Sequence, residues 1–187
     1  MGGTREHIPV LYDEVLGGLQ PRPGGIYIDA TVGGGGHAEG LLHASAPSGR
    51  LLGLDADPEA FEYCRRVLAS YEVRLVLRVA NFRHLGAVAR TAGFGQVDGV
   101  LMDLGISSRQ LRDGGRGFSF DTEGPLDMRL DRKQRQSAGD LVNNVSEAEL
   151  ADLLWRYGEE RHGRRLAKAI VGARPLTTTS QLADLVA

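Results

Sequence analysis

Apolar and polar positions along the first hundred residues predict strands and helices in alternation. Four short stretches rich in Val, Ile and Leu are typical of buried strands: Gly25–Asp29, Arg50–Asp55, Val73–Val79 and Val97–Leu104. The segments between them have the apolar spacing of helices: Ala38–Ala44, Pro58–Ser70 and His84–Ala92. Because strands joined through helices of this length need crossover connections, the pattern predicts a parallel sheet and an α/β fold.

The pattern changes after Leu104. Residues Gly105–Asp131 are rich in glycine and arginine, show little periodicity, and predict a long ordered loop. Three helices are then expected: one that starts near Ser146, one over Arg161–Ala173, and one that starts near Thr178–Ser180. At the first, Ser146 and Glu149 are expected to form a capping box. The last helix has reached about two turns at residue 187, and four strands are half of a doubly wound sheet. We therefore expect the chain to be part of a longer protein.

Composition narrows the class of protein. The 187 residues are 42% hydrophobic and 25% charged, which is ordinary for a globular domain, and the net charge of −2 does not by itself indicate nucleic-acid binding. The one cysteine, Cys64, falls at an apolar helical position and is expected in the core. A chain with one cysteine has no disulfide framework, which fits the cytoplasm. No apolar stretch approaches a membrane span, and no cluster has metal-ligand spacing, so neither membrane nor metal is expected.

A run of four glycines, residues 33–36, follows the first predicted strand and its terminal carboxylate, Asp29. Glycines let the backbone turn tightly there, and the N–H groups of the following helix would face a ligand such as a nucleotide-like cofactor. Asp55, 20 residues after Gly35, is suited to ribose hydroxyls. An acidic residue before the loop favours S-adenosylmethionine, which carries a cationic sulfonium and no pyrophosphate. The alternatives are a turn without a ligand and, for Asp55, a solvated aspartate.

Other candidate residues follow the remaining strands. Because the carboxyl ends of parallel strands share one edge, Asp55, Phe82 and Asp103 are expected to gather there. Phe82 suits packing against an adenine or in the core, and Asp103 suits catalysis or methionine binding. His7 and His37 are each interpreted as a polar group satisfied within the fold or, less readily, as a base. Asp57 is expected to cap the helix that Pro58 opens.

Basic and aromatic residues alternate in the long loop. Such a pattern can bind phosphates while stacking bases of single-stranded RNA. It is equally consistent with a solvated loop held by ion pairs to Asp113, Asp121 and Asp131. The residues concerned are Arg109, Arg112, Arg116, Arg129, Arg132, Lys133 and Arg135, which flank Phe118 and Phe120.

Taken together, several segments resemble the MraW/RsmH ribosomal RNA methyltransferases, which methylate N4 of a cytosine in the small-subunit (16S) RNA. Each is weak alone, but together they occur in family order from one end of the chain to the other. They are His7–Leu11, Asp29–His37, Leu54–Pro58, Asp103–Leu111, Arg116–Phe120, Gly124–Arg129 and Tyr157–Arg161.

The resemblance implies a Rossmann-like methyltransferase sheet in residues 1–106, a helical substrate-recognition insertion in residues 107–187, and further strands that are absent here. It also implies that ribosomal RNA, within a ribosomal particle, is the substrate. Asp103 is our candidate catalytic residue. Rival interpretations are a nicotinamide dehydrogenase and a catalytically inactive fragment that binds RNA and cofactor. The implied S-adenosylmethionine contacts are Gly35, Gly36, His37, Asp55, Phe82, Asp103 and Gln110.

Overall fold

The computed structural model describes residues 9–187, so His7 lies outside the described residues. The chain divides into two compact units, the first ending at Gly105 and the second covering Ile106–Ala187.

The first unit is built on a four-stranded parallel sheet with the order β3-β2-β1-β4. Its strands are β1 (Ile26–Asp29), β2 (Arg50–Asp55), β3 (Leu75–Val79) and β4 (Gly99–Leu101). Its helices are α1 (Tyr12–Leu19), α2 (Gly36–Ala44), α3 (Pro58–Val67) and α4 (Leu85–Thr91), with short 3-10 turns η1 (Ala69–Tyr71) and η2 (Phe82–His84). The alternation and the parallel pairing confirm the predicted α/β, Rossmann-like fold class.

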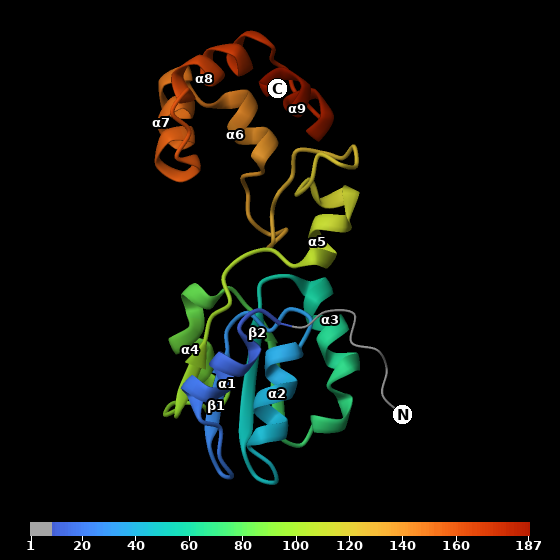
Figure 1. Ribbon diagram of the computed structural model, residues 1–187, viewed down its shortest axis with the longest axis vertical. Coiled ribbons are helices and arrows are strands. Elements are labelled where there is room, and N and C mark those ends of the chain that lie inside the picture. Colours follow the sequence, from blue (N-terminus) through green and yellow to red (C-terminus); the bar gives the residue numbers. More distant parts are fainter. Residues whose placement is uncertain (1–8) are drawn as a thin grey trace. The chain divides into compact units, whose positions relative to one another are not determined.

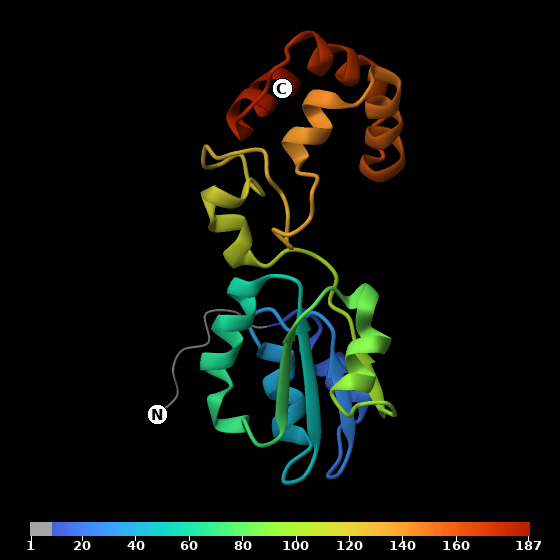
Figure 2. The same ribbon diagram turned by 180° about the vertical axis from the view of Figure 1, so that it is seen from behind.

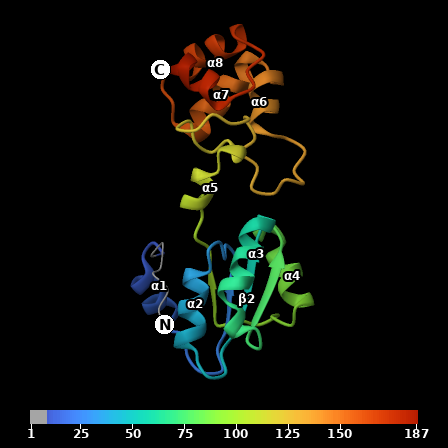
Figure 3. The same ribbon diagram turned by 90° about the vertical axis from the view of Figure 1, so that its right-hand side faces the viewer.

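Helices cover both faces of this sheet (Figures 1 and 2). On one face, Tyr27 and Leu51 pack with residues of α1, α2 and α3, including the buried Cys64. On the other, Ile28 and Leu52 pack with α4 and the buried Phe94. Figure 3 shows α4 on the side of the sheet away from α1 and α2. The core position predicted for Cys64 is confirmed, and its burial raises the pKa of the thiol to about 12.

Three strands are shorter than the sequence pattern predicts, and β1 lacks only the first predicted residue, Gly25. β3 begins at Leu75 because Arg74 still belongs to a turn, in which its N–H bonds the carbonyl of Tyr71. β4 ends at Leu101 because the next amide that faces β1 does not bond a strand carbonyl. This amide belongs to Asp103, and it donates to the side chain of Thr31 in the β1–α2 loop.

The second unit is helical, with α5 (Ser108–Arg112), η3 (Gly114–Arg116), α6 (Ala138–Asn144), α7 (Glu147–Gly158), α8 (Gly163–Gly172) and α9 (Thr179–Val186) (Figure 1). Its core is an apolar cluster to which α6, α7, α8 and the segments before α6 and α9 contribute: Leu126, Val142, Leu150, Ala167, Ile170 and Leu176.

The three expected helices of this unit are present as α7, α8 and α9. The capping box expected at the start of α7 is only half formed. Ser146 accepts the Glu149 N–H at 3.2 Å, which is one half of the expected capping box. Complete boxes begin α5 and α6, where Ser107 and Ser137 each exchange hydrogen bonds with the residue three positions on. Both helices are too short for a clear apolar period, which is why the sequence pattern did not predict them.

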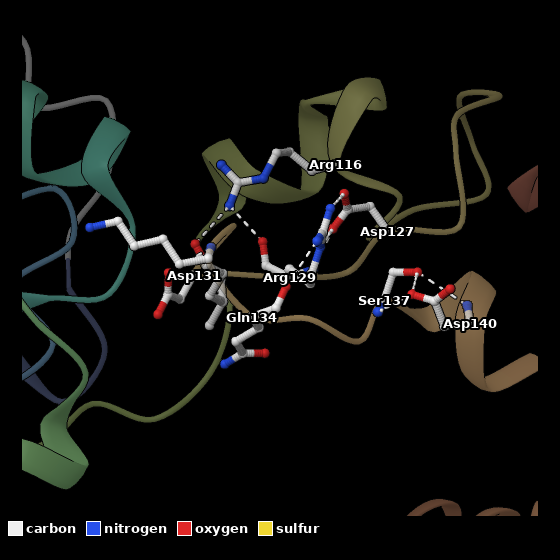
Figure 4. Close-up of polar contacts among 9 residues, drawn as sticks. Arg116, Asp127, Arg129, Asp131, Gln134, Ser137 and Asp140 are labelled. Atoms are coloured by element: carbon white, nitrogen blue, oxygen red, sulfur yellow. Dashed lines mark hydrogen bonds and ion pairs between the residues drawn. The ribbon is translucent and has the colours of Figure 1, made fainter.

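Within the long loop, two of the arginines serve the fold (Figure 4). Arg129 forms a two-pronged ion pair with Asp127, with Nε and Nη2 each 2.8 Å from a carboxylate oxygen, and this pair lowers the pKa of Asp127 to about 2. Arg116 is buried and donates to the carbonyls of Arg129 and Leu130. These contacts support the structural interpretation for both side chains. Asp127 is the ion-pair partner here, and it was not among the aspartates expected in that role.

Candidate functional site at the carboxyl edge of the sheet

The glycine loop between β1 and α2 adopts a backbone that requires glycine. Gly33 has φ 47° and Gly35 has φ 82°, in the left-handed region that side chains disfavour. A Cβ at Gly35 would lie 3.3 Å from both the Cys64 sulfur and a Leu68 methyl carbon. Gly35 is the N-cap of α2 and supplies no side-chain cap, so the loop presents backbone at the start of the helix.

The residues after Gly35 are covered by the segment before α1. A Cβ at Gly36 would collide with the ring of Pro9. His37 is buried, its Nε2 lies 3.0 Å from the Val10 carbonyl, and its ring stacks against Tyr12 at 6.3 Å. These contacts make His37 a polar group satisfied within the fold. Its Nδ1 also lies 3.9 Å from a carboxylate oxygen of Asp103, which brings two of the predicted site residues together.

Asp55, at the end of β2, links two neighbouring loops. Its Oδ2 accepts the Gly33 N–H at 2.9 Å and its Oδ1 accepts the Asp57 N–H at 2.9 Å. Burial raises the pKa of Asp55, and these two N–H donors act against that rise. These bonds and its partial burial hold Asp55 in place, and its contact with a ribose stays a prediction. Asp57 caps α3 by accepting the Glu59 N–H at 3.0 Å, as predicted.

Asp103 lies two residues beyond β4 and is tied to the loop after β1. Its N–H donates to Thr31 Oγ1 at 2.8 Å, while its side chain is 43% exposed. The Thr31 N–H in turn donates to Asp29 Oδ1 at 3.1 Å. Two strand ends are thus joined through one threonine, and the Asp103 carboxylate stays accessible to solvent.

Asp29 is the buried member of this group. Its pKa is raised to about 7, chiefly because the side chain is removed from water, and the charges of Asp55 and Asp103 raise it further. The Thr31 N–H acts in the opposite direction. Three carboxyl groups therefore lie close enough at this edge for their charges to interact.

Phe82 and Gln110 complete the predicted set. Phe82 begins η2 just after β3 and is 42% exposed, so it is not a fully buried core residue. Gln110 belongs to the second unit, where its Oε1 accepts the Ser107 N–H at 2.9 Å as part of the α5 capping box. Thr31, which connects Asp29 with Asp103, was not predicted. The signal that could have indicated it is a hydroxyl residue between a strand-terminal carboxylate and a glycine loop.

Within residues 9–187, no three His, Cys, Asp or Glu side chains are grouped so that they could hold a metal ion. Among the same residues, no helix is both long and apolar enough to cross a membrane.

The parallel sheet, the glycine loop and the acidic carboxyl edge define the class of Rossmann-like α/β proteins. The family model described as the MraW methylase family matches residues 4–187. The chain belongs to that family, as its sequence motifs predicted.

Curated relatives extend this match over the whole chain. "Ribosomal RNA small subunit methyltransferase H" of Syntrophobacter fumaroxidans is 49% identical over 100% of this chain and 59% of its own length. The protein of the same name from Thermomicrobium roseum is 51% identical over 97% of this chain and 56% of its own length. The chain thus spans little more than half the length of these relatives.

Among solved structures, the C-terminal domain of precorrin-6Y C5,15-methyltransferase from Rhodobacter capsulatus is 19% identical. The match covers 82% of this chain and 74% of that domain, with a TM-score of 0.43, a likeness too distant to argue from.

Proposed function

We propose that the protein to which this chain belongs transfers a methyl group from S-adenosylmethionine to N4 of a cytosine in small-subunit ribosomal RNA. The observation that carries the proposal is the family match over residues 4–187. The acidic edge beside the glycine loop supports it independently. A ribosomal particle in the cytoplasm is the proposed substrate, since ribosomal RNA is found there.

The residues at the edge fit this cofactor. S-adenosylmethionine supplies an activated methyl group on a positively charged sulfur, and it carries an amino-acid end, a ribose and an adenine. The half-exposed Asp103 carboxylate is suited to the cationic end. Asp55 keeps a second lone pair on each oxygen for ribose hydroxyls, and the half-exposed Phe82 ring offers an apolar face for adenine.

The backbone of the glycine loop and the first turn of α2 complete the proposed cofactor site. Gly35, Gly36 and His37 are proposed to contribute backbone contacts, because they form the N-terminal end of α2, where Gly35 is the N-cap and supplies no side-chain cap. Gln110 is proposed as a further contact from the second unit. Residues 1–106 would then be the cofactor-binding part, and residues 107–187 the part that receives RNA.

Asp103 is proposed as the catalytic residue. The N4 amino group of cytosine is a poor nucleophile because its lone pair is delocalised into the ring. A carboxylate that accepts a hydrogen bond from N4–H localises that lone pair and helps to orient the amine. The position of Asp103 at the exposed end of β4 suits this role as well as binding of the methionine end.

The test is transfer of a tritiated methyl group to small-subunit particles that lack the modification, using the complete gene product that contains these residues. We expect Asp103→Asn to lower the rate of transfer by about 100- to 10,000-fold. Asp13→Asn, a matched change at an exposed position in α1, is expected to leave the rate unchanged. Normal transfer by Asp103→Asn would refute the assignment of this residue.

Calorimetric titration separates the rival interpretations. Binding of S-adenosylmethionine and not of NAD is expected, and the reverse would favour a dehydrogenase. Cofactor and RNA binding without any transfer by the unaltered complete protein would instead identify a binding protein that has lost catalysis.

A further inference from the structure

We propose that Thr31 is a positioning residue whose hydroxyl group holds Asp103 in place at the end of β4. This inference rests on the proposed function, because it assigns to Thr31 an effect on the reaction that acts through Asp103. Thr31 itself is not proposed to touch substrate or cofactor.

The argument starts from the pairing of β1 with β4. The two strands are in parallel register up to Asp29 and Leu101, and the Ala30 N–H still bonds the Leu101 carbonyl at 2.9 Å. The next β4 amide that faces β1 belongs to Asp103. It donates to Thr31 Oγ1 at 2.8 Å, so a side-chain oxygen takes the place that a strand carbonyl has in a regular ladder.

Thr31 is itself anchored to a group that cannot move easily. Its N–H donates to Asp29 Oδ1 at 3.1 Å, and its Oγ1 lies 3.5 Å from the same oxygen. Because the hydroxyl oxygen accepts from Asp103, its proton is available to donate to Asp29. Asp29 is almost fully buried in the sheet, which gives the connection a fixed end.

Asp103 is followed by an exposed segment, residues 104–107. Leu104, the next residue, is 66% exposed, and Gly105 follows with φ 154°. The Asp103 carboxylate lies 3.9 Å from His37 Nδ1, beyond hydrogen-bond distance. The backbone bond to Thr31 therefore determines where the carboxylate lies. A displacement of about 1 Å in a catalytic group can cost about 100-fold in rate.

The test uses substitutions at Thr31 in the complete gene product, with methyl transfer as the first readout. Thr31→Val keeps the shape but removes the acceptor, and we expect kcat to fall about 10- to 100-fold. Thr31→Ser keeps the hydroxyl and is expected to restore kcat to within about threefold of the unaltered protein. Thr91→Val is the matched control, because the Thr91 hydroxyl bonds carbonyls of its own helix, α4.

A double-mutant cycle separates positioning from general damage. If Thr31 acts through Asp103, then Thr31→Val lowers neither the residual transfer nor the cofactor affinity of Asp103→Asn any further. A further loss equal to that seen in the unaltered protein would overturn the inference. So would equal activities of Thr31→Val and Thr31→Ser.

A readout that does not need activity keeps the inference testable if the proposed function fails. Amide hydrogen exchange of Asp103, measured by NMR on this chain, is expected to be slow in the unaltered protein and in Thr31→Ser, and fast in Thr31→Val. Thr31→Ala serves in place of Thr31→Val if the latter does not fold. Equal protection of the Asp103 amide in all variants would refute the positioning role. Absence of methyl transfer by the unaltered protein, with protection as expected, would refute only the proposed function.

Discussion

At the scale of single residues, the site contains two aspartates that end neighbouring strands and yet differ in environment. Asp55 accepts N–H bonds on both oxygens, from Gly33 and Asp57. Asp29 is more deeply buried, and its hydrogen bonds are to the N–H and hydroxyl of one residue, Thr31. The pKa of Asp29 is consequently raised to about 7, so its ionisation changes within the physiological pH range.

This difference predicts a pH-dependent stability. Since the pKa of Asp29 is about 7 in the folded protein and about 3.9 in an unfolded chain, the folded state binds the extra proton between these values. The contribution of Asp29 to stability is therefore present below about pH 4 and is lost as the pH rises to about 7, at up to about 1.4 kcal/mol per pH unit.

Asp29→Asn removes this titration. We expect its free energy of unfolding, relative to the unaltered chain, to rise between pH 5 and pH 7, as measured by native-state hydrogen exchange of the β1 and β2 amides. The same pH dependence in both proteins would show that Asp29 is ionised throughout this range.

At the scale of elements, the start of α2 shows that four consecutive glycines are not equivalent. Gly35 has φ 82° and is packed against Cys64 and Leu68, whereas the nearest atom to a Cβ at Gly34 would be a ring carbon of Tyr63 at 4.0 Å. The sequence predicted a glycine loop before a helix, and that is confirmed. It did not indicate which glycine is indispensable, because the neighbours that decide this come from α3 and its C-terminal end.

Gly35→Ala is therefore expected to strain the loop by about 1–2 kcal/mol and to weaken binding of S-adenosylmethionine about tenfold. Gly34→Ala, the matched control, should bind within about threefold of the unaltered chain, because it has both space and an ordinary backbone conformation. Isothermal titration calorimetry on this chain compares the two. Equal affinities would mean that the cofactor does not approach this turn.

At the scale of the whole molecule, the two units are stabilised by different means. The first has two apolar layers around a sheet, and the second has one apolar cluster together with polar anchors in a long loop. Among these anchors are the Asp127–Arg129 ion pair and the buried Arg116 (Figure 4). Charge-assisted bonds of this kind contribute more when they are partly buried, as the Asp127–Arg129 pair is.

Asp127→Asn should consequently lower the stability of the second unit by about 1–3 kcal/mol. Trp155, the one tryptophan of the sequence, lies in α7 and reports unfolding of this unit by fluorescence. Asp152→Asn breaks the exposed pair with Arg156 and is expected to change stability by less than about 1 kcal/mol. The hydrogen-exchange rates of the β1 and β2 amides, which lie in the first unit, should be the same in both variants as in the unaltered protein. Equal unfolding midpoints for the two variants would contradict the anchoring role of Asp127.

Local pattern by itself determined the approximate positions of the strands, most helices, the glycine loop and the cap of α3, because these depend on residues a few positions apart. The motifs, taken in order, also predicted the family. The sequence also predicted that Asp55 and Asp103 lie at one edge of the sheet. The tertiary structure added the strand order β3-β2-β1-β4, which brings the buried Asp29 close enough to both for their charges to interact. It also decided that Thr31 joins Asp29 to Asp103 and that Asp127 pairs with Arg129. The Asp103–Thr31 bond joins residues 72 positions apart, and the burial of Asp29 depends on the sheet and helices around it, so no local pattern could specify either of them.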